Sequence, residues 1–207
     1  MKAVAITANP EEKSLTNTVG RTFLEGFRES ATSSERSTDF IWLDALDFRA
    51  EYTAADRAHY LGTAPVPADV AALQERIADT DVMALCFPIY WYTMPALMKS
   101  FFDRVLCSGF AFDPVTGAPL ALVGKKVRVF MLTGSSEQWF KDSGIDTALQ
   151  LQIREHTFRK YCGVEDVELV YVSGLTTLND SATRTAVGKQ LDHVREIGRA
   201  MASELTR

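Results

Sequence analysis

Apolar and polar residues alternate in blocks along this chain, and the blocks predict strands and helices in turn. Apolar residues recur at helical spacing from Leu15 to Phe27, through Ala68–Ala78, from Pro95 onward, through Thr147–Tyr161 and from Val187 to Leu205. Between these stretches lie short, largely apolar runs, typical of strands covered on both faces: Lys2–Thr7, Phe40–Leu43, Val82–Phe87, Val127–Leu132 and Glu168–Val172. This alternation predicts an α/β fold, a three-layer sandwich in which a five-stranded parallel sheet has helices on both faces.

In a sheet of this kind, ligands bind beyond the carboxyl ends of the strands. Three loops are expected there: Ala8–Ser14, Pro88–Met94 and Thr133–Phe140. The first loop offers hydroxyl groups and leads into a helix, whose first backbone N–H groups can bind an anion such as a phosphate. Ser14 and Thr16 suit an ordinary helix cap equally well.

The second loop holds three consecutive aromatic residues, Tyr90, Trp91 and Tyr92, where turns usually carry small polar residues. Their rings suit a flat heteroaromatic ligand, and the alternative is that they pack in the core or against another subunit. The third loop begins Thr-Gly-Ser-Ser, which allows a ring edge to approach closely or forms a plain turn. A phosphate at the first loop and a flat ring at the other two describe flavin mononucleotide (FMN).

Composition and charge narrow the class of protein. The chain has 207 residues, 46% of them hydrophobic and 24% charged, as expected for one soluble domain spanning residues 1–207. A net charge of −5 argues against nucleic-acid binding and against an anionic membrane surface. No segment approaches the roughly 18 apolar residues of a membrane span, and the N-terminus is too quickly polar for a signal peptide. Three scattered cysteines favour the cytoplasm.

Motifs that would indicate other chemistry are missing from the sequence. It has no G-x-G-x-x-G after the first strand, no phosphate-binding P-loop and no G-x-S-x-G nucleophile turn. It also has no cysteine pair or His-Glu motif, so we expect no metal site. The histidines (His59, His156, His193) are expected to be structural or exposed, and Cys86 and Cys162 to lie in the core.

The run FPIYWYTMPALMKSFFDRVLCSGFAF, Phe87–Phe112, resembles the NAD(P)H:quinone oxidoreductases with a flavodoxin-like fold. That family includes bacterial quinone and drug reductases and ancillary subunits of glutathione-gated potassium efflux systems. Further matches are the NP…SLTN loop, GKK before the fourth strand, Thr133-Gly134 and the YCG at Tyr161–Gly163. The resemblance implies FMN, or FAD if the 108–124 loop holds an adenosine, together with NAD(P)H and a small aromatic acceptor. It also implies a homodimer, for which the apolar stripe that follows Pro95 is expected to supply the contact.

The same resemblance implies roles for individual residues. Ser14, Leu15 and Thr16 would hold the phosphate end of the flavin. The flavin ring would be flanked, largely through backbone groups, by Pro88, Ile89, Tyr90, Trp91 and Tyr92. Thr133 and Gly134 would hydrogen-bond to its pyrimidine edge, and Trp91 and Tyr92 would also form the wall for either ring substrate.

The chain departs from the family at positions next to the flavin. Asn9 stands where the family often has histidine, and Ser135 where it often has a second glycine; we keep both as candidate cofactor-binding residues. Phe140 and Asp146 stand where quinone reductases often place a tyrosine and a histidine as proton donors. Phe140 cannot donate a proton, and an ionised Asp146 would disfavour the anionic reduced flavin. Asp146 is a candidate proton donor only if its pKa is raised.

Other functions stay open from the sequence alone. One is a regulatory subunit that binds the cytoplasmic part of a membrane transporter, and another is a one-electron carrier of the flavodoxin type. An α/β domain without a cofactor is a third. The sequence does not distinguish NADH from NADPH, because no basic cluster for a 2′-phosphate stands out.

Overall fold

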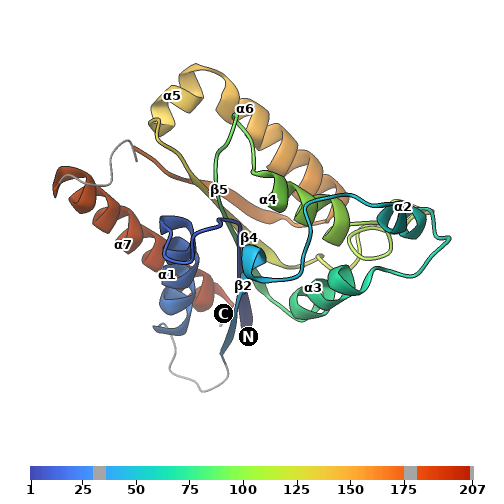
Figure 1. The fold of residues 1–207 in the computed structure, drawn as a ribbon. Coiled ribbons are helices and arrows are strands. Elements are labelled where there is room, and N and C mark those ends of the chain that lie inside the picture. The colour runs from blue at the N-terminus through green and yellow to red at the C-terminus, as the bar shows by residue number, and fades with distance from the viewer. Residues whose placement is uncertain (30–35, 175–180, 206–207) are drawn as a thin grey trace.

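A computed structural model describes residues 1–29, 36–174 and 181–205 of the chain. One parallel sheet runs through it (Figure 1), and its strands follow the order β2-β1-β3-β4-β5. Its strands are β1 (Lys2–Thr7), β2 (Ser37–Trp42), β3 (Val82–Pro88), β4 (Lys126–Leu132) and β5 (Asp166–Val172). The predicted five-stranded parallel sheet is therefore confirmed.

Helices cover both faces of this sheet. The long helices α1 (Leu15–Glu29) and α7 (Ser181–Glu204) lie side by side on one face (Figure 1). The other face is covered by α3 (Ala68–Ala78), α4 (Ala96–Ser100), α6 (Ile145–Leu149) and the π-helical segments η2 (Phe101–Val105) and η3 (Gln150–Tyr161). Successive residues of β3 from Val82 to Phe87 point alternately to the two faces and are fully buried, which explains the continuous apolar sequence.

The apolar stripe that follows Pro95 has a different role from the expected one. Its residues pack in the core beneath the sheet, where Met98, Phe101 and Val105 are fully buried. The interpretation of this stripe as a subunit contact is therefore wrong, because the core of the chain itself takes up these side chains.

Several boundaries also differ from the sequence prediction. Strand β2 begins at Ser37, and Leu43 already belongs to the short 3₁₀ helix η1 (Leu43–Ala45). Two short helices are additional: α2 (Ala54–Tyr60) and α5 (Glu137–Asp142). The second of these takes up part of the stretch Thr133–Phe140 that was expected to be a loop. Among the described residues, no helix combines the length and apolar character needed to cross a membrane.

All three cysteines are free and buried, as expected for Cys86 and Cys162. Burial raises the pKa of the Cys86 thiol far above its ordinary value. It also raises the pKa of the Cys107 thiol, and that of Cys162 to about 12. The thiols therefore stay protonated at neutral pH.

Two glycines set the close packing of α1 against α7. A Cβ atom on Gly198 would lie 2.3 Å from the backbone oxygen of Phe23, and one on Gly26 would lie 2.1 Å from that of Arg195. Gly198→Ala is therefore expected to force the helices apart and to lower the free energy of unfolding by about 1–3 kcal/mol, measured by urea denaturation. Gly188→Ala is the control, since a Cβ there meets nothing within 4 Å. An equal loss in both variants would contradict the packing argument.

Candidate functional site

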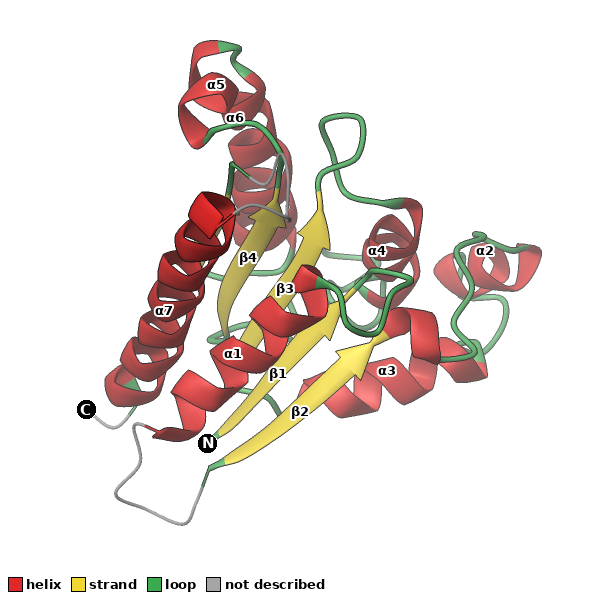
Figure 2. Cartoon of the chain, turned by 60° about the vertical axis from the view of Figure 1, so that its left-hand side comes forward, coloured by secondary structure: helices red, strands yellow, loops and turns green. Residues whose placement is uncertain are grey.

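The loops that follow β1, β3 and β4 all lie at the carboxyl edge of the sheet, as predicted (Figure 2). Because β1, β3 and β4 are neighbours in the sheet, their loops are brought together although they are far apart in the sequence. The same edge carries the N-terminus of α1 and helix α5 (Figure 2).

The first loop ends in a capped helix that still has free N–H groups. The Oγ atom of Ser14 accepts a hydrogen bond from the backbone N–H of Asn17 at 3.2 Å. Ser14 therefore caps α1, which is the helix-cap role considered from the sequence. The backbone N–H groups of Leu15 and Thr16 donate no hydrogen bond within the described part of the chain, as is general for the first turn of a helix. The helix therefore keeps two donors for an anion.

Asn9 organises this loop. Its Nδ2 atom donates to Thr16 Oγ1 at 3.2 Å, and its Oδ1 atom accepts from the backbone N–H of Glu11 at 3.0 Å. Its backbone oxygen also accepts a 2.7 Å hydrogen bond from Trp42 Nε1. In the described structure the side chain of Asn9 therefore joins the loop to the first turn of α1.

The second loop is a strained turn. The backbones of Tyr90 and Thr93 exchange hydrogen bonds of 2.9 and 3.1 Å, and the two residues between them, Trp91 and Tyr92, have φ angles of 47° and 64°. Both φ angles lie in the left-handed region, as in a type I′ turn, which favours Asn-Gly. Trp91 is 92% exposed and Tyr92 52%. Strained backbone under exposed aromatic rings points to a function for these rings.

The third loop is small and leads into helix α5. Gly134 has open space where a side chain would be, with no atom within 4 Å of a Cβ built there. The Oγ atom of Ser136 caps α5 by accepting from the N–H of Trp139 at 3.2 Å. Trp139 then stacks on Tyr92 of the second loop, with ring centres 6.0 Å apart and planes at 25°. This pair joins the two loops across the sheet edge.

Two adjoining cavities lie among these loops. One, of about 350 Å³, is lined by the first loop and the start of α1 together with Pro88, Tyr90 and Leu132. The other, of about 560 Å³, is lined by Trp91, Tyr92, Ser135, Trp139 and Phe140. Ile89, Thr133 and Gly134 line both. We name them the loop cavity and the aromatic cavity.

The two cavities fit the parts of a flavin. The loop cavity places two free helix N–H groups, hydroxyl groups and the Lys13 side chain around one space, which suits a phosphate. The open space above Gly134 joins it to the aromatic cavity, whose rings suit a flat ring system.

The structure brings together most of the residues expected at the site. All of the cofactor candidates line one or both cavities: Asn9, Ser14, Leu15, Thr16, Pro88, Ile89, Tyr90, Trp91, Tyr92, Thr133, Gly134 and Ser135. Asp146 does not line either cavity. It lies in α6, where its Oδ1 atom accepts a 2.9 Å hydrogen bond from the Tyr171 hydroxyl.

Sequence analysis missed four lining residues: Glu11, Lys13 and Leu132 of the loop cavity and Trp139 of the aromatic cavity. Lys13 lies beside the first free helix N–H groups, and Trp139 forms part of the aromatic cavity. Trp139 could have been found from Ser136 and Glu137, because a serine followed by an acidic residue is a common helix start that would have placed the next aromatic residues on a short helix.

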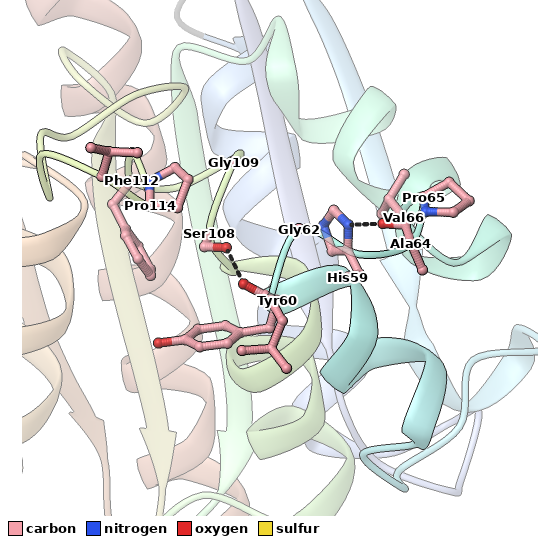
Figure 3. Close-up of a pocket in the computed structure, with 12 residues that line it drawn as sticks. His59, Tyr60, Gly62, Ala64, Pro65, Val66, Ser108, Gly109, Phe112 and Pro114 are labelled. Carbon is pink, nitrogen blue, oxygen red and sulfur yellow. Dashed lines mark hydrogen bonds between the residues drawn. The ribbon is translucent and has the colours of Figure 1, made fainter.

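The most voluminous of the described cavities, of about 620 Å³, lies elsewhere, between the end of α2 and the 108–115 segment (Figure 3). His59 lines it, and its Nδ1 atom pairs with the backbone oxygen of Ala64 at 3.4 Å. The Ser108 hydroxyl donates to the backbone oxygen of Tyr60 at 3.2 Å. These polar groups already have partners within the chain, so this cavity offers less to a phosphate than the loop cavity does.

Within the described ranges, no cluster of His, Cys, Asp or Glu is placed to hold a metal ion.

Comparison with known proteins agrees with this geometry. Residues 1–196 match the protein family that is described as having a flavodoxin-like fold. The chain belongs to this family. It is also similar to the solved structure of an NAD(P)H:quinone oxidoreductase from Methanothermobacter marburgensis, with a TM-score of 0.83, 25% identity and 96% of each chain covered.

Curated relatives match over shorter stretches. An uncharacterized NAD(P)H oxidoreductase of Haemophilus influenzae is 29% identical over 123 residues, which cover 59% of this chain and 60% of that protein. The human ribosyldihydronicotinamide dehydrogenase [quinone] is 33% identical over 98 residues, covering 46% and 42%. The potassium-efflux ancillary protein KefG of Cronobacter sakazakii is 41% identical over 78 residues, covering 38% and 41%. The chain thus spans about half the length of the curated relatives it matches, and the resemblance to quinone oxidoreductases is confirmed.

Proposed function

We propose that the protein is a flavin-dependent NAD(P)H oxidoreductase that passes two electrons to a quinone or a similar small aromatic acceptor. The observation that carries this proposal is the strained turn of Trp91 and Tyr92, which presents two exposed rings at the edge of the aromatic cavity. Relatives named as NAD(P)H oxidoreductases and quinone dehydrogenases support it.

FMN is the proposed cofactor, with FAD as the alternative. The N–H groups of Leu15 and Thr16 would bind its phosphate, with Ser14 and Asn9 shaping that end of the site. Thr133 and Gly134 line the space that its ring would enter. A bound flavin supplies the two-electron redox chemistry, and the protein supplies binding and orientation.

The aromatic cavity would hold NAD(P)H and the acceptor in turn. Each substrate is planar where it reacts, so Trp91 and Tyr92 can stack against it and exclude water from one side. Because both substrates would use the same aromatic cavity, of about 560 Å³, we expect them to bind alternately.

The first test is an absorbance spectrum of the purified protein, followed by anaerobic addition of NADH and of NADPH. Flavin bands that bleach within the mixing time are expected and would identify the preferred donor. Flavin that stays oxidised with both donors would contradict the reductase and favour a regulatory protein or an electron carrier. A colourless protein that also fails to bind added FMN and FAD would contradict the flavin site itself. Chromatography of the released flavin distinguishes FMN from FAD.

Gly134 gives a sharper test of where the flavin lies. Gly134→Leu should fill the space that joins the two cavities and weaken FMN binding by at least about tenfold, measured by fluorescence titration of the apoprotein. The melting temperature of the apoprotein should change little, because a Cβ atom there meets no atom within 4 Å and the side chain would extend into the space between the cavities. Gly188→Leu on α7, which is also open, is the control and should bind FMN normally. Normal FMN binding by Gly134→Leu would place the flavin elsewhere.

A homodimer also belongs to this proposal. With the Pro95 stripe buried, its support is a group of exposed apolar side chains near the cavity of Figure 3, including Leu61 at 57% and Val115 at 90%. Sedimentation equilibrium should give twice the chain mass of 23.0 kDa. The mass of a single chain at micromolar concentration would contradict the dimer.

One observation favours a second candidate function. The identity with KefG, 41% over 78 residues, is higher than with the quinone dehydrogenase, 33% over 98. The protein could on that ground be a flavin-binding regulatory subunit of a transporter. Co-purification with a membrane transporter, together with flavin that NAD(P)H does not reduce, would support this candidate over the reductase.

A further inference from the structure

The aromatic cavity has a second wall, next to the strained turn. Residues 137–146, which we call the wall segment, comprise α5 and the start of α6. Trp139 is 41% exposed and lines the cavity, and it contacts both Tyr92 across the cavity edge and Phe140 beside it. The indole ring is perpendicular to the Phe140 ring, at 81°, with centres 5.3 Å apart. Trp139 is therefore held by ring contacts on two sides.

Tyr171 of β5 holds the wall segment against the sheet by a ring contact and a hydrogen bond. This residue lies near the end of β5, where it pairs with Met131 of β4, so its backbone is fixed by the sheet. Its ring lies 5.3 Å from that of Phe140, and its hydroxyl donates a 2.9 Å hydrogen bond to Oδ1 of Asp146. One side chain of the sheet thus contacts the segment at Phe140, within α5, and at its last residue, Asp146.

Phe140 connects Trp139 to Tyr171 by ring contacts. It is 2% exposed and lies between Trp139 and Tyr171, so a shift of either neighbour passes to the other through close packing. A loosened Tyr171 would let the wall segment move away from the sheet and carry Trp139 with it.

We propose that Trp139 is a specificity-determining residue for the acceptor, and that Tyr171 and Asp146 are positioning residues that hold it in place through Phe140. This inference rests on the proposed oxidoreductase function. Because the exposed face of Trp139 offers a broad ring surface, acceptors with two fused rings gain more stacking area from it than acceptors with one ring.

The Tyr171 hydroxyl is suited to a permanent hydrogen bond. Burial, the hydrogen bond to Asp146 and the charge of that carboxylate together raise the pKa of Tyr171 well above its ordinary value. The hydroxyl therefore stays protonated and keeps donating. The charged neighbours Glu137 and Lys141 pair with each other at 2.7 Å. The hydrogen bond that Asp146 accepts comes from Tyr171.

The first experiment tests the fastening in the apoprotein, without any catalysis. Tyr171→Phe keeps the ring contact with Phe140 and loses only the hydroxyl. We expect amide hydrogen exchange across residues 137–146 to become about tenfold faster, and the near-ultraviolet circular dichroism of the Tyr92–Trp139 stack to weaken. Asp146→Ala should do the same, whereas Asp146→Asn should retain wild-type exchange because its Oδ1 atom can still accept. Tyr161→Phe is the matched control, since Tyr161 also packs on a phenylalanine, Phe112, at 5.8 Å.

The second experiment tests specificity by steady-state kinetics with 1,4-benzoquinone and 1,4-naphthoquinone. Trp139→Ala should lower kcat/KM for the two-ring quinone about three- to tenfold more than for the one-ring quinone, and Trp139→Phe should restore part of the difference. Tyr171→Phe should raise the KM for naphthoquinone about threefold without changing the KM for NAD(P)H. Tyr161→Phe should leave both values unchanged.

The outcomes separate this inference from the proposed function. Unchanged exchange in Tyr171→Phe would overturn the positioning role, even if activity fell. Equal losses for both quinones in Trp139→Ala would overturn the specificity role. If NAD(P)H fails to bleach the flavin of the wild-type protein, the proposed function is overturned, and the specificity role of Trp139 with it. The exchange data on the apoprotein would still report whether Tyr171 and Asp146 fasten the wall segment.

Discussion

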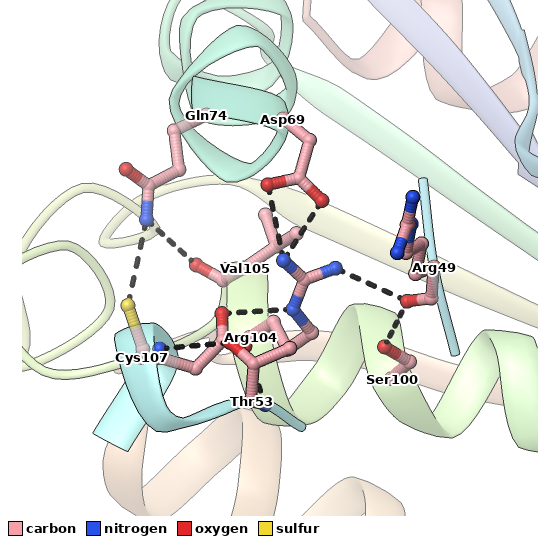
Figure 4. A network of polar contacts seen from close by, with 9 residues as sticks. Arg49, Thr53, Asp69, Gln74, Ser100, Arg104, Val105 and Cys107 are labelled. Carbon is pink, nitrogen blue, oxygen red and sulfur yellow. Dashed lines mark hydrogen bonds and ion pairs between the residues drawn. The ribbon is translucent and has the colours of Figure 1, made fainter. Parts of the chain in front are cut away.

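Arg104→Met is expected to lower the free energy of unfolding by about 3–5 kcal/mol. The side chains of Arg104 and Asp56 are 4% and 3% exposed, and Arg104 Nε donates to Asp56 Oδ1 at 2.8 Å (Figure 4). The guanidinium group also binds Asp69 at 2.8 Å and the backbone oxygen of Arg49 at 3.1 Å. Methionine has a similar length but no charge, so the variant leaves the buried Asp56 carboxylate without its cation, although Thr53 still donates to it. The Arg49 oxygen loses one donor and keeps the hydrogen bond from Ser100 Oγ.

Urea denaturation measures this loss, and Lys99→Met is the matched control. Lys99 pairs with Asp103 at 2.5 Å, but the two side chains are 49% and 42% exposed. Removal of an exposed pair should cost less than about 1 kcal/mol. An equal loss of unfolding free energy in both variants would show that burial does not make the Arg104 ion pair more stabilising than an exposed pair.

The same network gives the protein a pH dependence. Burial by itself would raise the pKa of Asp56, but hydrogen bonds from Thr53 and Arg104 outweigh it and hold the pKa below the ordinary value of 3.8. A carboxyl group with a lowered pKa in the folded state stabilises the fold above its ordinary pKa and ceases to do so as the pH falls through the lowered one. The stability lost below about pH 4 should therefore be smaller in Arg104→Met than in the wild type.

The double substitution Trp91→Asn with Tyr92→Gly is expected to stabilise the protein while it lowers activity. Both positions have positive φ, at 47° and 64°, and Asn-Gly is the favoured sequence for such a turn. Relief of the strain should add about 1 kcal/mol to the free energy of unfolding. Loss of both rings, and of the stack with Trp139, should lower kcat/KM for the acceptor by about tenfold or more.

Thermal unfolding and steady-state kinetics on the same preparations test both halves. Trp91→Ala is the comparison variant: it removes the exposed ring but leaves Tyr92 in its strained conformation, so turnover should fall without the gain in stability. Flavin should remain bound in both variants, because its contacts with this loop are expected to come from the backbone. A double variant that is less stable than the wild type would mean that ring packing outweighs the strain.

The elements predicted most accurately are those that a local apolar pattern and its flanking residues define. The strand Lys2–Thr7 and the helix Ala68–Ala78 have the predicted bounds, because each is a distinct apolar pattern that ends in polar residues or follows prolines. Helix α2 was missed because only Asp56 of its residues is buried, so no apolar stripe marks it. Its signal is instead the capping box of Thr53 and Asp56.

The candidate site was predicted at the level of its loops and not of its side chains. The order of strands in the sheet follows general rules, so the meeting of the three loops could be expected. The hydrogen bond from Tyr171 to Asp146 joins residues 25 positions apart on different elements, and nothing in the local sequence indicates it. The positive φ angles of Trp91 and Tyr92 are equally invisible in the sequence, since large aromatic residues are poor signals for that conformation.

The buried cysteines have a consequence for the proposed reduction of quinones. Quinones are electrophiles that add to thiolates, and a protonated, buried thiol reacts poorly. Cys86, Cys107 and Cys162 are all buried, and burial raises the pKa of each thiol. The fold would in this way shield the protein from arylation by its own proposed substrates, so that it could work through many turnovers in the presence of compounds that inactivate proteins with exposed cysteines.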